Sequence, residues 1–326
     1  MSRKKRLLVL TSGGDSPGMN AAIRAVVRSS CYRNLEVFAC HDGYLGLVER
    51  QIFPIDTCGV SGCIQCGGTI LRAGRAKHFH NPEVRNNVVE FLQQQKIDFL
   101  VPIGGDGTFR GAALLEKEGG PKCIGIPGTI DNDIVGTEYT IGYDTARNNA
   151  LRSIDKIRDT SASSGMYFLV ETMGRNAGFL AVDIGLASGA EFIVTPEYPI
   201  SVPDIAAKIL NPVRKRHSVL IVIAEADRPG RSFDIAKALE LLTPEFSYRV
   251  CVLGHVQRGG QPTAQDRLVA SIMGDLAVKG LLEGKSLQMT ALNNNKYCLV
   301  DLPSPDKSSR CLTDQELLQL NAVLSV

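Results

Sequence analysis

The stretch FLVPIGGDGT, residues 99–108, is the part of the sequence that best indicates the fold of this chain. An apolar run of the length of one buried strand leads straight into a glycine-rich loop. The same order recurs where polar or glycine-rich segments follow LLVL (7–10), CIGIP (123–127), YFLV (167–170), VLIVI (219–223) and VCVL (250–253).

Amphipathic helical patterns separate these apolar runs. SPGMNAAIRAVVRSS (16–30) carries Arg24 and Arg28 on one face, and RNNALRSIDKIRDTS (147–161) is a second such pattern. Strands that alternate with helices predict βαβ units, so we predict an α/β fold with mainly parallel sheets. Ligands of such sheets bind beyond the carboxyl ends of the strands, which makes the polar segments after the apolar runs the candidate functional segments.

The composition excludes several classes of protein. A length of 326 residues suggests about two domains, and 44% hydrophobic with 21% charged residues is ordinary for a globular protein. A net charge of +2 leaves no overall field that would draw the chain to nucleic acid or a membrane. The apolar part of MSRKKRLLVL is too short for a signal peptide, and no run reaches membrane-spanning length. We therefore expect a cytoplasmic protein without a nucleic-acid or membrane partner.

The nine cysteines are expected to be reduced thiols. Cys58, Cys63 and Cys66, followed by His78 and His80, raise the alternative of a metal site. A zinc site would have a second CxxC or a wider histidine pair where this chain has H-x-H. We interpret the segment as a cysteine-bearing helix that leads into the glycines of CGGTI.

Two glycine-rich loops, TSGGDSPG (11–18) and GGDGT (104–108), each follow a strand and open a helix. Free backbone N–H groups and the helix dipole make such loops good phosphate cradles, although glycine there can serve conformation alone. Neither loop matches GxxxxGK[ST] or GxGxxG. The loops thus suggest phosphate binding without either of the common nucleotide motifs.

The segment PGTIDNDI (127–134) places Asp131 and Asp133 two residues apart, directly after a strand. In an extended segment both would point the same way, toward Asp106 of the neighbouring loop. Carboxylates that converge on phosphate-binding loops need a hard cation, and Mg²⁺ with a nucleotide fits. In the alternative interpretation the carboxylates only cap backbone N–H groups in an Asx-type turn.

Fixed positive charges would complete a phosphoryl-transfer site, because the transferred group spreads charge over its oxygens. Taken singly, each basic residue could be an ordinary surface side chain. The blocks ETMGRNAG (171–178) and GHVQRGGQP (254–262) are harder to explain in that way. The candidates in or beside glycine-rich or strand-end segments are Arg75, Arg175, Arg249, His255 and Arg258.

With TSGGDSPGMNAAIR, GGDGT, PGTIDNDI, MGR and GHVQRGG in this order, the chain resembles the bacterial ATP-dependent 6-phosphofructokinases over nearly its whole length. The resemblance implies two three-layer α/β domains with the active site in the cleft between them, and a homotetramer that shares substrate sites between subunits. Residues 1–141 plus about 257–307 would bind ATP, and residues 142–256 plus about 308–326 would bind the sugar phosphate.

The resemblance also implies roles for single residues. Asp131 matches the general base that takes the proton from the C1 hydroxyl of fructose 6-phosphate, with Thr129 and Arg175 as further catalytic residues. Asp106 and Asp133 match the carboxylates that hold Mg²⁺. The ATP-binding positions are Gly14, Arg75, Ala76, Gly105, Asp106, Gly107 and Thr108. The substrate-binding positions are Thr129, Asp131, Met173, Gly174, Arg175, Glu225, Arg249, His255 and Arg258.

The donor and the regulation are implied in the same way. Diphosphate-dependent relatives carry Asp and Lys where this chain has Gly107 and Gly128. These two small residues would leave room for the adenine nucleotide, which favours ATP as the phosphoryl donor. The resemblance implies an effector site for ADP or phosphoenolpyruvate. One arginine expected in that site is Thr57 here. The alternative is that these basic residues only form a solvated basic face. The matching effector positions are Arg24, Arg28, Arg158, Glu191, Arg214 and Arg216.

One departure concerns the substrate. Met166 stands where the family has an arginine that reaches a neighbouring subunit's sugar 6-phosphate. Methionine cannot make that charge-assisted bond, which is worth roughly 1.5–3 kcal/mol. Two alternatives therefore stay open: a kinase of another sugar phosphate, such as sedoheptulose 7-phosphate, and a non-catalytic effector-binding paralogue. From about Leu281 onward the sequence carries no interpretable motif.

Overall fold

The computed structural model describes residues 3–74, 76–211, 217–303 and 315–325. They form two compact units. Unit 1 comprises the described residues of Met1–Ile130, Ile134–Thr145 and Arg258–Ser309, and unit 2 those of Asp131–Asp133, Ala146–Gln257 and Arg310–Val326.

Unit 1 contains a seven-stranded sheet. Its strands are β1 (Arg6–Thr11), β2 (Glu36–Cys40), β3 (Ile52–Pro54), β4 (Phe99–Gly104), β5 (Lys122–Pro127), β10 (Gln288–Asn293) and β11 (Lys296–Asp301). The order is β11-β10-β5-β4-β1-β2-β3, and only β3 and β11 run antiparallel to their neighbours. The mainly parallel sheet confirms the predicted fold class.

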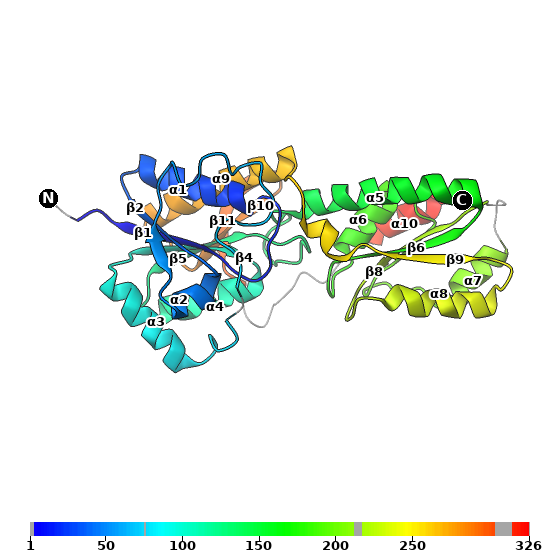
Figure 1. Cartoon of the computed structure of the whole chain (residues 1–326), viewed down its shortest axis with the longest axis horizontal. Coiled ribbons are helices and arrows are strands. Elements are labelled where there is room, and N and C mark those ends of the chain that lie inside the picture. The colour runs from blue at the N-terminus through cyan, green and yellow to red at the C-terminus, as the bar shows by residue number, and fades with distance from the viewer. Residues whose placement is uncertain (1–2, 75, 212–216, 304–314, 326) are drawn as a thin grey trace. The chain divides into compact units, whose positions relative to one another are not determined.

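Helices cover both faces of this sheet (Figure 1). The helices α1 (Met19–Tyr32) and α9 (Ala264–Leu282) pack together on one face, and α2 (Gly43–Val48), α3 (Pro82–Gln94) and α4 (Asp106–Lys117) lie on the other. Two of these helices, α3 and α9, begin at residues that cap them. The side chains of Asn81 and Thr263 accept hydrogen bonds from backbone amides in the first turns of α3 and α9.

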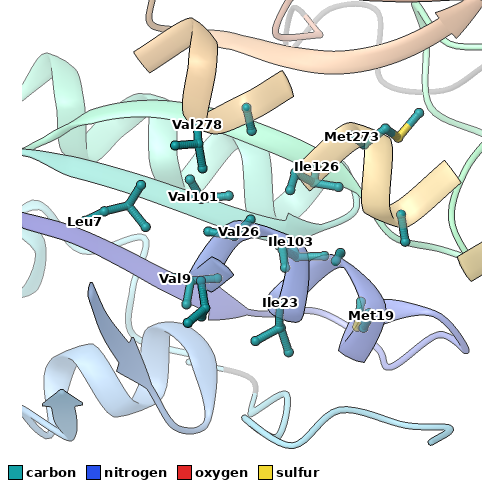
Figure 2. Packing of buried hydrophobic residues seen from close by; sticks show 14 of the residues in the cluster. Leu7, Val9, Met19, Ile23, Val26, Val101, Ile103, Ile126, Met273 and Val278 are labelled. Carbon is teal, nitrogen blue, oxygen red and sulfur yellow. The ribbon is translucent and has the colours of Figure 1, made fainter. Parts of the chain in front are cut away.

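One core cluster of unit 1 lies between the sheet and the pair α1 and α9 (Figure 2), and a second lies on the face that α2, α3 and α4 cover. Val101 of β4 and Ile126 of β5 belong to one buried cluster with Ile23 of α1 and Val278 of α9, and all four side chains are fully buried. Each such aliphatic side chain contributes about 1.5–3 kcal/mol through burial. This packing holds the carboxyl ends of the strands, with their loops, in fixed positions.

Unit 2 contains a four-stranded, fully parallel sheet in the order β7-β8-β6-β9, formed by β6 (Tyr167–Thr172), β7 (Phe192–Val194), β8 (Leu220–Ala224) and β9 (Tyr248–Val252). A 3₁₀ turn, η1 (Gly254–Arg258), follows β9. One face carries α5 (Tyr143–Ser164), α6 (Phe179–Ala187) and α10 (Gln315–Leu324), and the other carries α7 (Val202–Leu210) and α8 (Arg231–Leu242) (Figure 1). Unit 2 is therefore also a three-layer α/β structure.

The predicted cysteine-bearing helix is wrong. Residues 57–62 form turns, because Asp56 Oδ1 accepts the amides of Cys58 at 2.9 Å and Gly59 at 3.0 Å. Gly62 adopts a φ of 69°, which a helix does not allow. Local side-chain bonds and glycine conformation override the helical pattern here.

The hairpin of β10 and β11 lies in the region that carried no interpretable motif. Its two-residue loop, Asn294 and Asn295, has φ values of 49° and 59°. Such left-handed pairs form the tight turns that match strand twist, and asparagine tolerates them. The Asn-Asn pair between two short strand-like runs was the signal.

None of the helices in the described ranges combines the length and apolar character that a membrane span requires.

Candidate active site

The two glycine-rich loops of unit 1 lie side by side. Their strands β1 and β4 pair in parallel, with Thr11 opposite Ile103. Thr108 Oγ1 donates to the carbonyl oxygen of Ser12 at 3.0 Å, which ties the second loop to the first. A Cβ on Gly104 would collide with that same carbonyl. The loops therefore lie together at the carboxyl edge of the sheet, and their role as phosphate cradles stays a prediction.

Within the second loop, Gly105 is the N-cap of α4 and Asp106 is its first residue. Gly107 is exposed, and a Cβ there would meet nothing within 4 Å. The buried hydroxyl of Thr108 is directed toward Ser12 instead. Of the other predicted ATP-binding residues, Ala76 packs against core residues of unit 1, and Arg75 lies outside the described residues.

Arg258 lies across the first loop. Its Nη1 donates to the carbonyl oxygen of Asp15 at 3.1 Å, and a Cβ on Gly14 would collide with the same nitrogen. Gly14 thus allows a cationic side chain to lie against the backbone that follows β1. The structure brings together two residues that the sequence assigned to different ligands.

Gly128 does not behave as predicted. A Cβ at this position would lie 3.0 Å from Met19 Cε and 3.2 Å from Ile103 Cγ2. We expected this small residue to leave room for the nucleotide. That expectation is wrong, because core side chains already fill the space into which a Cβ of residue 128 would project. Gly107 is the residue of the pair that faces open space.

The second group of candidates lies in unit 2 around Asp131, whose side chain is 1% exposed. Arg175 Nε lies 3.3 Å from Asp131 Oδ2, and the Arg175 N–H donates to Glu225 Oε1 at 3.2 Å. Burial raises the pKa of Glu225, and the nearby carboxylates of Asp131 and Glu171 raise it further. A buried carboxylate, a guanidinium and a second carboxyl group therefore share one site.

The segment around Asp131 is not extended, which removes the condition on which Asp131 and Asp133 were predicted to point the same way. Residues 130–131 form a bend, and Asn132 has a left-handed φ of 52°. Asparagine tolerates this conformation better than most residues. Before the bend, the carbonyl oxygen of Thr129 accepts Thr140 Oγ1 at 2.7 Å, and the chain is thereby held as it leaves unit 1.

Arg249 is not part of this group. It is the second residue of β9 and pairs with Phe168 near the amino end of β6, whereas Met173, Gly174 and Arg175 follow the carboxyl end. Met166 lies just before β6, at the same end as Arg249. The exposed His255 lies on η1, after the carboxyl end of β9.

The predicted effector residues that the structure describes are divided between the two units. Arg24 and Arg28 lie on α1 in unit 1. Arg158 on α5 donates from Nε to the Ser188 carbonyl at 3.1 Å, and its Nη1 lies 3.8 Å from Glu191 Oε1 in unit 2. The predicted positions Arg214 and Arg216 lie outside the described residues.

Within the described parts of the chain, no three or more histidine, cysteine, aspartate or glutamate side chains are grouped so that they could hold a metal ion. This holds for the segment with Cys58, Cys63 and Cys66. Any cation near Asp106 or Asp133 would therefore take most of its ligands from elsewhere, as Mg²⁺ does from phosphates and water.

Sequence reasoning missed three residues that shape these loops: Ser12, Glu197 and Gln257. Ser12 accepts from Thr108, while Glu197 and Gln257 accept backbone amides of the segment that carries Arg175. Ser12 and Gln257 lie inside motifs that the sequence singled out, and Glu197 lies three residues after β7. A polar residue just past a buried strand was the available signal.

Comparisons with known proteins agree with these motifs. The family model described as phosphofructokinase matches residues 6–281. The chain is 49% identical to an ATP-dependent 6-phosphofructokinase of Coxiella burnetii, over 99% of each chain, and 46% identical to one of Bacillus cytotoxicus, over 99% of this chain and 100% of the relative. The phosphofructokinase structure from Saccharomyces cerevisiae superimposes with a TM-score of 0.84 at 32% identity over 98% of this chain, which spans 46% of that longer chain.

Proposed function

The chain belongs to the phosphofructokinase family, and from this premise we propose how its residues transfer the γ-phosphate of ATP to the C1 hydroxyl of fructose 6-phosphate. It is an ATP-dependent phosphotransferase of glycolysis. The observation that carries the proposed mechanism is the buried carboxylate of Asp131 beside Arg175.

Asp131 acts as the general base. A sugar hydroxyl is a weak nucleophile at neutral pH, and a positioned base accelerates its attack by about 10²–10⁴-fold. Asp131 takes the C1 hydroxyl proton while the oxygen forms its bond to the γ-phosphorus and ADP leaves. Arg175, whose side chain is 56% exposed, stays within reach of the substrate and balances negative charge on the transferred group. Thr129, just before Asp131, would complete the catalytic set.

ATP binds the loops after β1 and β4 in this proposal. The backbone of Gly14, Gly105 and Gly107 offers N–H groups to phosphate oxygens, and the open space at Gly107 favours a nucleotide over a donor that needs a side chain there. Thr108 acts through the loop geometry that it holds.

Mg²⁺ would be held by Asp106 and Asp133. Their carboxylate oxygens are the hard ligands that this ion prefers, and phosphate oxygens and water would fill the rest of its shell. When bound, the ion neutralises charge on the phosphates.

The sugar phosphate would contact residues of one chain and Arg249 of a second copy. The residues of the first chain are Met173, Gly174, Arg175, Glu225, His255 and Arg258. Within one chain Arg249 and Arg175 lie at opposite ends of the sheet of unit 2, separated by a strand that rises about 3.3 Å per residue. This separation supports a homo-oligomer with shared sites, which we propose to be a tetramer.

Regulation and location complete the proposal. The pair Arg158 and Glu191, with Arg24 and Arg28 of α1, would form an effector site for ADP or phosphoenolpyruvate. We propose a cytoplasmic location, in keeping with the glycolytic reaction.

The acceptor is tested by measuring ADP release with Mg-ATP over a concentration series of fructose 6-phosphate and then of other sugar phosphates. We expect the highest kcat/KM with fructose 6-phosphate. A higher value with sedoheptulose 7-phosphate would show that Met166 marks a change of acceptor. No turnover on any acceptor would support a non-catalytic role.

A further inference from the structure

The turn after β6 has an unusual backbone. Gly174 has a φ of 143°, and a Cβ there would lie 2.6 Å from the carbonyl oxygen of Ala177. Arg175 has a left-handed φ of 51° although it is not glycine. A non-glycine residue keeps such a conformation only where surrounding contacts impose it. The direction of the Arg175 side chain therefore depends on what holds this turn.

Three backbone N–H groups of the turn donate to side chains from the segments that follow the other three strands of the unit 2 sheet. Each of these segments supplies one acceptor, so hydrogen bonds hold the turn at its beginning, middle and end. The bonds run from Met173 to Gln257 Oε1 at 2.8 Å, from Arg175 to Glu225 Oε1 at 3.2 Å, and from Gly178 to Glu197 Oε1 at 2.8 Å.

The first and last of these acceptors are closely fitted. Gln257 is fully buried, and its own carbonyl oxygen accepts Asn149 Nδ2 at 3.4 Å. A Cβ on Gly178 would lie 2.7 Å from Glu197 Oε2, so glycine is required for the carboxylate to reach this amide. A shift of the turn would break the buried hydrogen bond to Gln257 and the part-buried one to Glu197.

We propose that Gln257 and Glu197 are positioning residues, which hold the two ends of the turn so that Arg175 stays directed at Asp131. The inference rests on the proposed role of Arg175 in the reaction. Glu225 holds the middle of the turn but also lies beside Asp131, so its own replacement would change charge at the site. Gln257 and Glu197 act on the reaction only through the turn.

The test is a double-mutant cycle on the full chain. Gln257→Met removes the acceptor at nearly constant volume, and Glu197→Met does the same at the other end. Glu197→Gln keeps an oxygen acceptor and serves as the conservative variant. Each is made alone and together with Arg175→Ala, and Glu240→Gln on the exposed face of α8 is the surface control. The readouts are kcat, the KM values for ATP and fructose 6-phosphate, and thermal unfolding.

We expect Gln257→Met and Glu197→Met each to lower kcat on the order of tenfold, with an unchanged KM for ATP, because one hydrogen bond that orients the cation is lost. Glu197→Gln should stay within about twofold of the parent chain. In the Arg175→Ala background the losses should shrink to less than about twofold, since the group that they orient is absent.

An equal loss in both backgrounds, or no loss in either, would overturn the positioning role. If Gln257→Met does not fold, the pair Glu197→Met and Glu197→Gln decides the question by itself. An Arg175→Ala chain with the parent kcat would instead overturn the proposed function of Arg175, and the positioning role with it.

Discussion

Arg175 Nε lies 3.3 Å from Asp131 Oδ2, which joins a half-exposed guanidinium to an almost fully buried carboxyl group. The different exposures of the two side chains suit the two roles proposed for them. The buried partner is shielded from water, as a base that must take one particular proton should be, while the exposed partner can still reach a ligand.

Asp131→Asn tests the base. The amide keeps the shape of the carboxylate but cannot take a proton, so we expect kcat to fall by about 10²–10⁴-fold with little change in the KM for ATP. Asp155→Asn, on the exposed face of α5, is the matched control. Near-normal turnover of the Asp131 variant would remove this residue from the role.

Gly14→Ala tests the contact between the first loop and Arg258. The added methyl group would collide with Arg258 Nη1, the far end of a flexible side chain, so the guanidinium should move while the fold persists. We expect a higher KM for fructose 6-phosphate and a melting temperature close to that of the parent chain. In an Arg258→Ala background Gly14→Ala should add nothing to the KM for the sugar. A further increase there would mean that Gly14 acts by another route.

Met166→Arg tests the departure from the family pattern. Met166 lies just before β6, at the strand end where Phe168 pairs with Arg249, so a new guanidinium would join an existing one. A charge-assisted bond to phosphate should lower the KM for fructose 6-phosphate by about 10–150-fold, with the KM for ATP unchanged. Met166→Leu controls for the loss of methionine. An unchanged or higher KM for the sugar in the arginine variant would show a site rebuilt around methionine.

Glu225→Gln tests the pH dependence of stability. Burial raises the pKa of Glu225 above its ordinary value of 4.5, so the folded chain holds this proton more tightly than the unfolded chain. Its stabilising contribution is therefore present below pH 4.5 and is lost as the pH rises through the raised pKa. Glutamine lacks this ionisation and can still accept the Arg175 amide.

The measurement is urea unfolding at several pH values between about 4 and 7. Relative to the parent chain, Glu225→Gln should become more stable as the pH rises, whereas Glu240→Gln, at an exposed position, should show no such trend. A parallel pH dependence of the Glu225 variant and the parent would contradict the raised pKa.

The sequence by itself determined the fold class and the loops on which the candidate site residues lie. Apolar runs such as FLVPI and VLIVI became strands because a continuous run of this length is buried most easily between two helical layers. The motifs after these runs lie at strand ends because parallel strands place their following loops at one edge. These are local rules, and they act within about ten residues.

Only the tertiary structure decided which distant residues meet. The bond from Gln257 to Met173 and that from Glu197 to Gly178 depend on the order β7-β8-β6-β9, which no local pattern contains. The same order places Arg249 away from Arg175, although both belong to family motifs. The order of strands in a sheet depends on how whole helices and strands pack together. Apolar packing far from a site therefore decides which side chains come together in it.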